Sequence, residues 1–167
     1  MNHGSDVLIR PATASDAAAI TRIYNEGIAD RVATLETSLR TPAERLEWLA
    51  ARSARHPVVV AEAGGEIVGW ASLNSFNPRE AYDQVADFSV YVARASRGQG
   101  VGTQLLDRLV ELARSLDYHK MVLAALAHNA AGVALYTRAG FAHVGVYREQ
   151  GQLDGRWVDV VVMEKLL

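Results

Sequence analysis

The chain contains no cysteine among its 167 residues. It can therefore hold no disulfide, no thiolate metal site and no cysteine nucleophile. Neither sign of charge predominates, because 17 Lys and Arg stand against 19 Asp and Glu, for a net charge of -2. Without a global positive field we expect neither nucleic acid nor a membrane as a partner, and any anion site must be local.

Long apolar runs are also missing. The longest, such as residues 158–163, fall far short of the roughly 20 residues that a membrane helix needs. Residues 1–6 lack the basic and apolar regions of a signal peptide, so we expect a cytoplasmic protein. The length and the 50% share of hydrophobic residues predict that 1–167 form a single domain with its own core.

Caps, turns and apolar periodicity predict an alternation of strands and helices. Thr13 and Asp16 have capping-box spacing, and Thr41-Pro42 with Glu44 is a strong helix start, to which Leu46, Trp48 and Leu49 would supply the apolar side. Gly140 is placed to end a helix. The expected strands are 7–10, 58–62, 67–73, 85–93, 121–126, 141–147 and 157–166, with helices after residues 13, 41, 101 and 129. This order indicates a single mixed α/β sheet domain.

A glycine loop, Arg97-Gly98-Gln99-Gly100-Val101-Gly102, lies between an expected strand and an expected helix. Backbone N–H groups in such a loop can converge on a diphosphate, helped by the helix dipole. The Walker spacing is absent, and the dinucleotide fingerprint fails because position 103 is Thr. A plain tight turn would also explain the glycines, but Arg94 and Arg97 beside them favour an anion.

Two further groups of residues could serve a site. The loop over residues 74–84 carries Phe76, Arg79 and Tyr82, an unusual mixture for a connector, and it could hold a ligand. His119, His128 and His143 are scattered without a metal-binding spacing, so we expect no metal.

The glycine loop and a downstream segment together resemble the GCN5-related N-acetyltransferase superfamily. The loop is similar to its coenzyme A motif, and Asn129 with the segment 135–141 (Leu-Tyr-Thr-Arg-Ala-Gly-Phe) is similar to the second half of its cofactor region. The element order also matches, so the resemblance covers nearly the whole chain. It implies a mostly antiparallel sheet flanked by helices, with a splayed central strand pair that binds acetyl-CoA.

A narrower resemblance concerns the subgroup that acetylates phosphinothricin and methionine sulfoximine or sulfone. It is carried by Ile9-Arg10-Pro11, Ile23-Tyr24-Asn25, Phe88-Ser89-Val90-Tyr91-Val92 and Gly155-Arg156-Trp157-Val158-Asp159. It implies acetyl transfer to the α-amine of a small amino-acid-like substrate by direct attack, in a homodimer. Members usually have Glu three residues before the Val-Tyr-Val segment, where this chain has Asp87.

In such a reaction each candidate residue has a role, given by the resemblance for the base, the acid and the cofactor residues, and by residue chemistry for the substrate residues. Asp87 would be the general base, through one water, with Glu26 and Glu36 as fallbacks, and Tyr136 would protonate the coenzyme A sulfur. Phe76, Arg79 and Tyr82 would bind the substrate, with Arg79 on its carboxylate. The cofactor would contact the backbone of Val90, Tyr91 and Val92, the loop residues Arg97, Gly98, Gln99, Gly100, Val101, Gly102 and Thr103, and the side chains of Asn129 and Tyr136. Each also has a structural explanation, as core, helix cap or solvated surface.

Three other functions compete with this interpretation. Acetylation of a protein N-terminus or of another small amine would keep the cofactor and change the substrate. An acyl-CoA sensor would bind the cofactor without turnover. A purely structural domain would gain no protection from coenzyme A against thermal unfolding.

Overall fold

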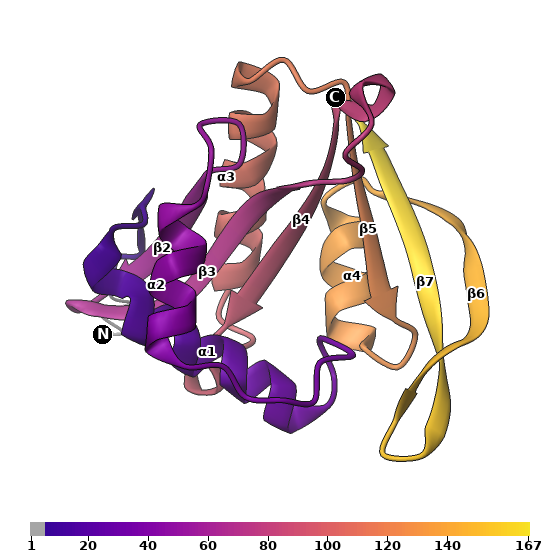
Figure 1. Cartoon of the computed structure of the whole chain (residues 1–167), viewed down its shortest axis with the longest axis horizontal. Helices are drawn as coiled ribbons and strands as arrows, with labels where there is room; N and C mark the ends of the chain where they lie inside the picture. Colours follow the sequence, from indigo (N-terminus) through magenta and orange to yellow (C-terminus); the bar gives the residue numbers. More distant parts are fainter. Residues whose placement is uncertain (1–5) are drawn as a thin grey trace.

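A computed structural model describes residues 6–167 of the chain (Figure 1). Residues 1–5, most of the segment considered for a signal peptide, lie outside the described residues. One seven-stranded sheet has the order β1-β2-β3-β4-β5-β7-β6, and only its β4–β5 pair is parallel. The strands are β1 (Leu8–Pro11), β2 (Val58–Ala63), β3 (Glu66–Ser75), β4 (Val85–Val92), β5 (Lys120–Leu126), β6 (Ala142–Leu153) and β7 (Arg156–Leu166). The predicted mixed, mostly antiparallel α/β sheet is confirmed.

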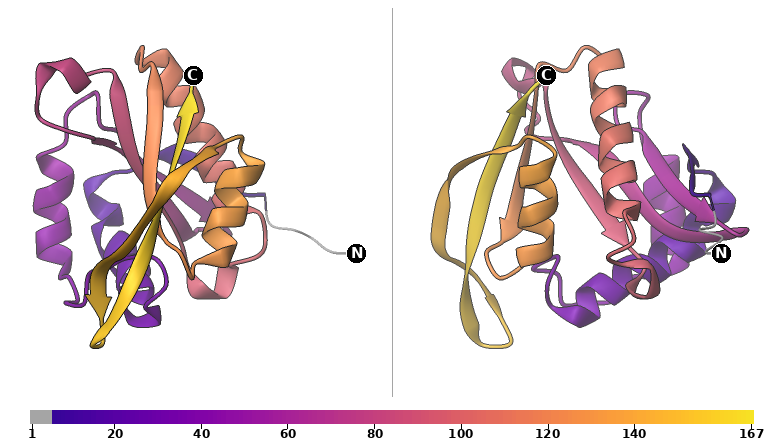
Figure 2. Two further views of the ribbon diagram at one scale, coloured as in Figure 1. Left: turned by 90° about the vertical axis from the view of Figure 1, so that its right-hand side faces the viewer. Right: turned by 180° about the vertical axis from the view of Figure 1, so that it is seen from behind.

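Helices cover both faces of the sheet. Figure 2 shows α1 and α2 on one face and α3 and α4 on the other. Their bounds are α1 (Ala17–Asp30), α2 (Pro42–Ala50), α3 (Val101–Ser115) and α4 (Ala130–Arg138), with short 3-10 turns η1 (Ala14–Asp16), η2 (Glu80–Tyr82) and η3 (Arg94–Ser96). On the α3 side, Leu105, Leu109 and Met121 are fully buried, and on the α1 side Ile20 and Ile23 are. Within residues 6–167 no helix is long and apolar enough to cross a membrane.

Helix α2 begins where the sequence predicts but buries a different face. The N–H of Glu44 donates to Thr41 Oγ1 at 3.2 Å, and Glu44 Oε2 accepts from the N–H of Thr41 at 2.6 Å. The inward positions follow 45, 48, 49 and 52, so Arg45 is 8% exposed and Leu46 is 45% exposed. The expectation that Leu46 packs inward was wrong, because a buried arginine occupies the place of an apolar residue.

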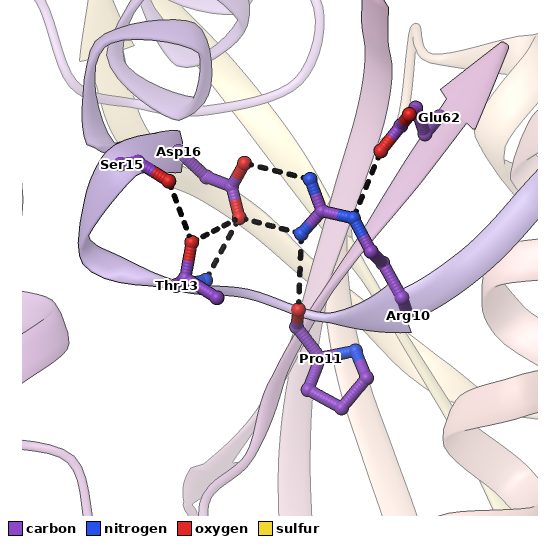
Figure 3. Close-up of polar contacts among 6 residues, drawn as sticks. All are labelled: Arg10, Pro11, Thr13, Ser15, Asp16 and Glu62. Atoms are coloured by element: carbon purple, nitrogen blue, oxygen red, sulfur yellow. Dashed lines mark hydrogen bonds and ion pairs between the residues drawn. The ribbon is translucent and has the colours of Figure 1, made fainter. Parts of the chain in front are cut away.

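Ion pairs of Arg10 join β1 to β2 and to the entrance of α1 (Figure 3). Arg10 on β1 donates to both carboxylate oxygens of Asp16, at 2.8 and 3.0 Å, and to Glu62 on β2 at 2.9 Å. Asp16 also accepts from the N–H of Thr13 at 2.8 Å, as the predicted capping box requires. Hydrogen bonds from Arg10 lower the pKa of Asp16 below its usual value. The pairs hold β1 and the entrance to α1 together.

The last hairpin is longer than the sequence predicts. β6 continues past Tyr147 to Leu153. Residues 148–152 are all polar or glycine, so they lack the alternation of apolar and polar side chains that predicts a strand. The pairing with β7 shifts register between Tyr147 and Gly151. At this bulge Glu149 has a φ of 50°, and its N–H donates to Asp159 Oδ1 at 2.8 Å. The bulge lets an irregular polar segment stay paired with a regular strand.

Candidate active site

The two central strands separate partway along their length. β4 and β5 pair only from Val85 to Asp87, opposite Lys120 to Val122. Beyond Asp87 the two strands diverge (Figure 1). The predicted splayed central strand pair is therefore present, and its vertex lies at Asp87.

The diverging part of β4 presents free backbone groups to the gap. The N–H of Ala93, directly after β4, donates to Val68 O in β3 at 2.8 Å. Because alternate residues of an antiparallel strand bond the same neighbour, Tyr91 and Ser89 face β3, while Val90 and Val92 face the gap. Arg97 Nε donates to Val92 O at 3.2 Å, which confirms that direction. A linear amide chain could pair with Val90 and Val92 as an added strand. The backbone of Tyr91 faces β3 instead, and its ring stacks on Trp70.

Three cavities lie along this gap, each sharing lining residues with the next, and we refer to the three together as the cleft. The first, of about 270 Å³, is lined by Asp87, Ser89, Tyr136, the last residues of β5 and Val160 of β7. The second shares Val90, Tyr91 and Asn129 with the first, and the third shares Val92, Arg97 and Ala131 with the second. The third, of about 310 Å³, contains the glycine loop and Thr103. The cleft thus joins the expected anion site to the expected reacting groups.

The glycine loop is open where an anion would approach it. Gly98 and Gly100 have φ values of 73° and 83°, and a Cβ at either would meet no atom within 4 Å. Gly100 is the N-cap of α3, so the first N–H groups of that helix open toward the loop. Val101 is buried in the core, and the Gln99 amide donates to Ala95 O at 3.2 Å. Neither of these two predicted cofactor residues has its side chain in the cleft lining, so only their backbone could serve.

Two arginines at the loop are held by one carboxylate. Asp30, the last residue of α1, accepts from Arg94 Nη2 at 2.7 Å and from Arg97 Nη1 at 2.7 Å. These hydrogen bonds keep the pKa of Asp30 below its ordinary value. Asp30 also lines the middle cavity. It thereby orients both guanidinium groups beside the loop, a role that sequence analysis missed because 67 positions separate Asp30 from Arg97.

Asp87 lies at the vertex of the cleft without a cationic partner. Its Oδ1 accepts the N–H of Phe88 at 2.6 Å. No ion pair to Asp87 occurs among residues 6–167. Burial raises the pKa of Asp87 above its usual value, although the Phe88 hydrogen bond partly opposes this. A carboxylate of raised pKa beside a cavity has the properties of a general base.

Tyr136 and Asn129 face the same cavity from α4. Burial, and next the nearby charge of Asp87, raise the pKa of Tyr136 to about 12. Its phenol is therefore a proton donor at neutral pH. Asn129 caps α4 by accepting the N–H of Gly132 at 3.0 Å, and it also lines the cleft, so its structural and functional explanations hold together. A base and an acid in one cavity suit a proton-coupled group transfer.

A segment of the same chain forms one wall of the reacting cavity. Ala33, Thr34 and Leu35 follow α1 and line it. The segment is tied across the gap, because Arg31 pairs with Asp154 at 3.1 Å in the β6–β7 turn. The sequence shows only an irregular stretch here, so this wall could not have been assigned without the tertiary contacts.

The predicted substrate residues lie elsewhere in this single chain. Phe76 and Tyr82 pack edge to face, with ring centroids 5.4 Å apart, and both are exposed. Neither they nor Arg79 belong to the residues that line the cleft. The fallback bases are also elsewhere, because Glu26 accepts from the Arg94 N–H and Glu36 pairs with Arg40. No cluster of three metal-ligating side chains occurs within 6–167.

Comparisons with known proteins agree with this geometry. Residues 20–141 match the model of the acetyltransferase (GNAT) family. The chain is 37% identical to the L-methionine sulfoximine/L-methionine sulfone acetyltransferase of Pseudomonas aeruginosa, over 93% of this chain and 92% of that protein.

Two solved structures extend the comparison. A phosphinothricin acetyltransferase from Sinorhizobium meliloti, in complex with acetyl-CoA, has a TM-score of 0.91 at 31% identity, covering 96% of this chain and 88% of that one. A ribosomal-protein-alanine N-acetyltransferase from Brucella melitensis has a TM-score of 0.92 at 39% identity, covering 96% and 99%.

Proposed function

The chain belongs to the acetyltransferase (GNAT) family, and from that membership we propose that it transfers acetyl from acetyl-CoA to the α-amine of a small amino-acid-like substrate. The substrates named for its relatives, phosphinothricin and methionine sulfoximine or sulfone, define the class. The observation that supports the proposal best is the single cleft that runs from the glycine loop to Asp87 and Tyr136.

The residues of the cleft fit acetyl-CoA, which supplies the acetyl group as a thioester. The glycine loop, with the N-terminus of α3 and the two arginines, suits a diphosphate. The backbone groups of Val90 and Val92 that face the gap suit the amides of a pantetheine arm, although Val92 O also accepts from Arg97. Asn129 and Tyr136 then lie beside the arm and the sulfur.

The proton transfers belong to two side chains. Asp87 takes a proton from the substrate ammonium through one water, and its raised pKa makes it a better base than an exposed aspartate. Tyr136 gives its phenolic proton to the leaving sulfur. The amine attacks the thioester carbon directly and the carbon–sulfur bond breaks, so no covalent enzyme intermediate is needed. The second proton of the amine leaves as the amide forms and restores the phenol of Tyr136. Glu26 and Glu36, both engaged by arginines, are weaker candidates for the base.

The remaining assignments concern assembly and location. We propose that the protein is a homodimer, which is supported by exposed apolar side chains on the last hairpin: Val144, Val146, Tyr147 and Trp157. A cytoplasmic location stays a prediction from the sequence. The substrate roles of Phe76, Arg79 and Tyr82 stay predictions. Light scattering of the purified protein tests the dimer, and a monomeric mass would contradict it.

A second candidate substrate is a protein N-terminus, favoured by the name of the Brucella melitensis enzyme. Release of coenzyme A, followed with a thiol reagent, separates the candidates, and the absence of cysteine removes any protein background. Turnover of phosphinothricin and methionine sulfone is the expected result. Turnover only of N-terminal peptides would replace the substrate, and cofactor binding without turnover of any amine would indicate an acyl-CoA sensor.

A further inference from the structure

A lysine faces inward near the end of β7. Val161 and Met163 of this strand are buried in the core that α3 covers, and the alternation of side chains along a strand places Lys165 on the same face. Lys165 forms no ion pair with a carboxylate of residues 6–167. Its Nζ donates instead to Ala139 O, directly after α4, at 2.7 Å. The ammonium therefore lies at a helix C-terminus, where the carbonyl groups carry partial negative charge.

The turn that ends α4 is built around this lysine. The N–H of Phe141 donates to Tyr136 O at 3.0 Å across Gly140, whose φ is 88°, as in a Schellman motif. A Cβ at position 140 would lie 2.7 Å from Lys165 Nζ. Glycine is thus required here both for the backbone conformation and for the space that the lysine occupies.

The same turn holds an aromatic ring against Tyr136. The rings of Phe141 and Tyr136 have centroids 6.3 Å apart at 68°. Phe88, the residue after Asp87, completes the group, with its ring centroid 5.7 Å from that of Tyr136 and 5.3 Å from that of Phe141. Lys165 Nζ lies 5.9 Å from the Phe141 centroid. The Tyr136 ring therefore packs against two rings, one of which the lysine holds in place.

We propose that Lys165 is a positioning residue for Tyr136, because it anchors the turn 139–141 to β7 and so keeps the phenol beside the reacting groups. The inference rests on the proposed function, in which Tyr136 is the acid. Lys165 is not among the residues that line the cleft, so its effect must pass through Tyr136. Proton transfer needs hydrogen-bond distance to the sulfur, so a ring that shifts with Phe141 transfers its proton less efficiently.

The test removes the ammonium and keeps the apolar stem. We expect Lys165→Met to lower kcat about 10-fold, less than the 10²-fold loss expected for Tyr136→Phe, with KM for acetyl-CoA unchanged. In the Tyr136→Phe background the same substitution should lower kcat no further, because the phenol that it positions is gone. Equal losses in both backgrounds, or an unchanged kcat in Lys165→Met, would overturn the inference. A general structural role would add its own loss to that of Tyr136→Phe.

Three variants accompany the cycle. Lys120→Met is the matched control, since it removes the only other lysine of the chain, which pairs with Glu164 of β7, and it should leave kcat unchanged. A loss equal to that of Lys165→Met would indicate a general effect at this end of the sheet and would overturn the inference. Lys165→Arg keeps a cation that can donate to Ala139 O and should restore most of the lost kcat. Lys165→Gln enters the same cycle if Lys165→Met does not fold.

Failure of the proposed function is distinguishable from failure of this inference. If the wild-type protein releases coenzyme A with no amine, the proposed function is wrong. NMR of the protein with ¹³C-labelled tyrosine rings then tests the positioning role without turnover, and the signal absent from Tyr136→Phe identifies Tyr136. In Lys165→Met we expect the Tyr136 ring signals to shift while those of the other tyrosines stay in place. Unchanged Tyr136 signals would overturn the inference.

Discussion

Replacing Asp87 with asparagine separates its chemistry from its structure. The amide oxygen of Asp87→Asn can still accept the Phe88 N–H, so the local backbone should persist. What is lost is the base, a contribution of about 10²- to 10⁴-fold, or about 3 to 5 kcal/mol of activation free energy. Because the proton passes through one water, we expect the lower end, a fall in kcat of about 10²-fold.

The assay is steady-state coenzyme A release as a function of pH. The wild-type rate should fall on acidification as Asp87 is protonated, starting at a higher pH than for an ordinary aspartate, because its pKa is raised. Asp87→Asn should lack this acidic limb, with KM for acetyl-CoA unchanged. A loss below about threefold, or an acidic limb that persists in the variant, would refute the assignment and move the base elsewhere.

Stability gives an independent check with the opposite sign. A carboxyl whose pKa is raised on folding binds its proton more tightly in the folded state, so the ionised form destabilises the fold at neutral pH. Asp87→Asn should therefore have a higher Tm than wild type at pH 7, and the difference should shrink as the pH falls. A variant that is both less active and less stable would indicate a structural role.

Three other substitutions test the cofactor site, the acid and the fold. Gly102→Val should raise KM for acetyl-CoA sharply, because a Cβ there already lies 3.2 Å from Leu135 Cδ2 at the cofactor cavity; unchanged affinity would remove the loop from the site. Tyr136→Phe should lower kcat about 10²-fold, with binding unchanged, since a phenol of pKa about 12 is protonated throughout the working range; full activity would exclude it as the acid. At pH values above 3.8, the ordinary aspartate pKa, Asp16→Asn should have a Tm several degrees lower than that of wild type. This difference in Tm should narrow below pH 3.8 and close as the pH falls through the folded-state pKa of Asp16, which Arg10 lowers. A Tm difference that stays constant across pH would contradict the ion pair.

The order of helices and strands could be predicted because it depends on neighbouring residues. Thr41, Pro42 and Glu44 satisfy each other's backbone groups whatever surrounds them. Gly140 ends α4 with a φ of 88°, which its own lack of a Cβ permits. The glycine loop likewise predicts an anion site, because the residues that indicate it lie within one short segment. The prediction was wrong where a polar residue is buried in place of an apolar one. On α2, Arg45 lies in the inward position that was expected of Leu46.

The sequence by itself determined the elements, the cofactor loop and the family resemblance, since each is carried by short, contiguous patterns. Only the tertiary structure decided that β4 and β5 separate at Asp87, that Asp30 holds Arg97, and that residues 33–35 wall the cavity. It also placed Arg79 outside the cleft and Ser89 within it. These features depend on strand register and on contacts between residues that are distant in the chain. Burial of the whole core determines both, and no short stretch of sequence encodes them.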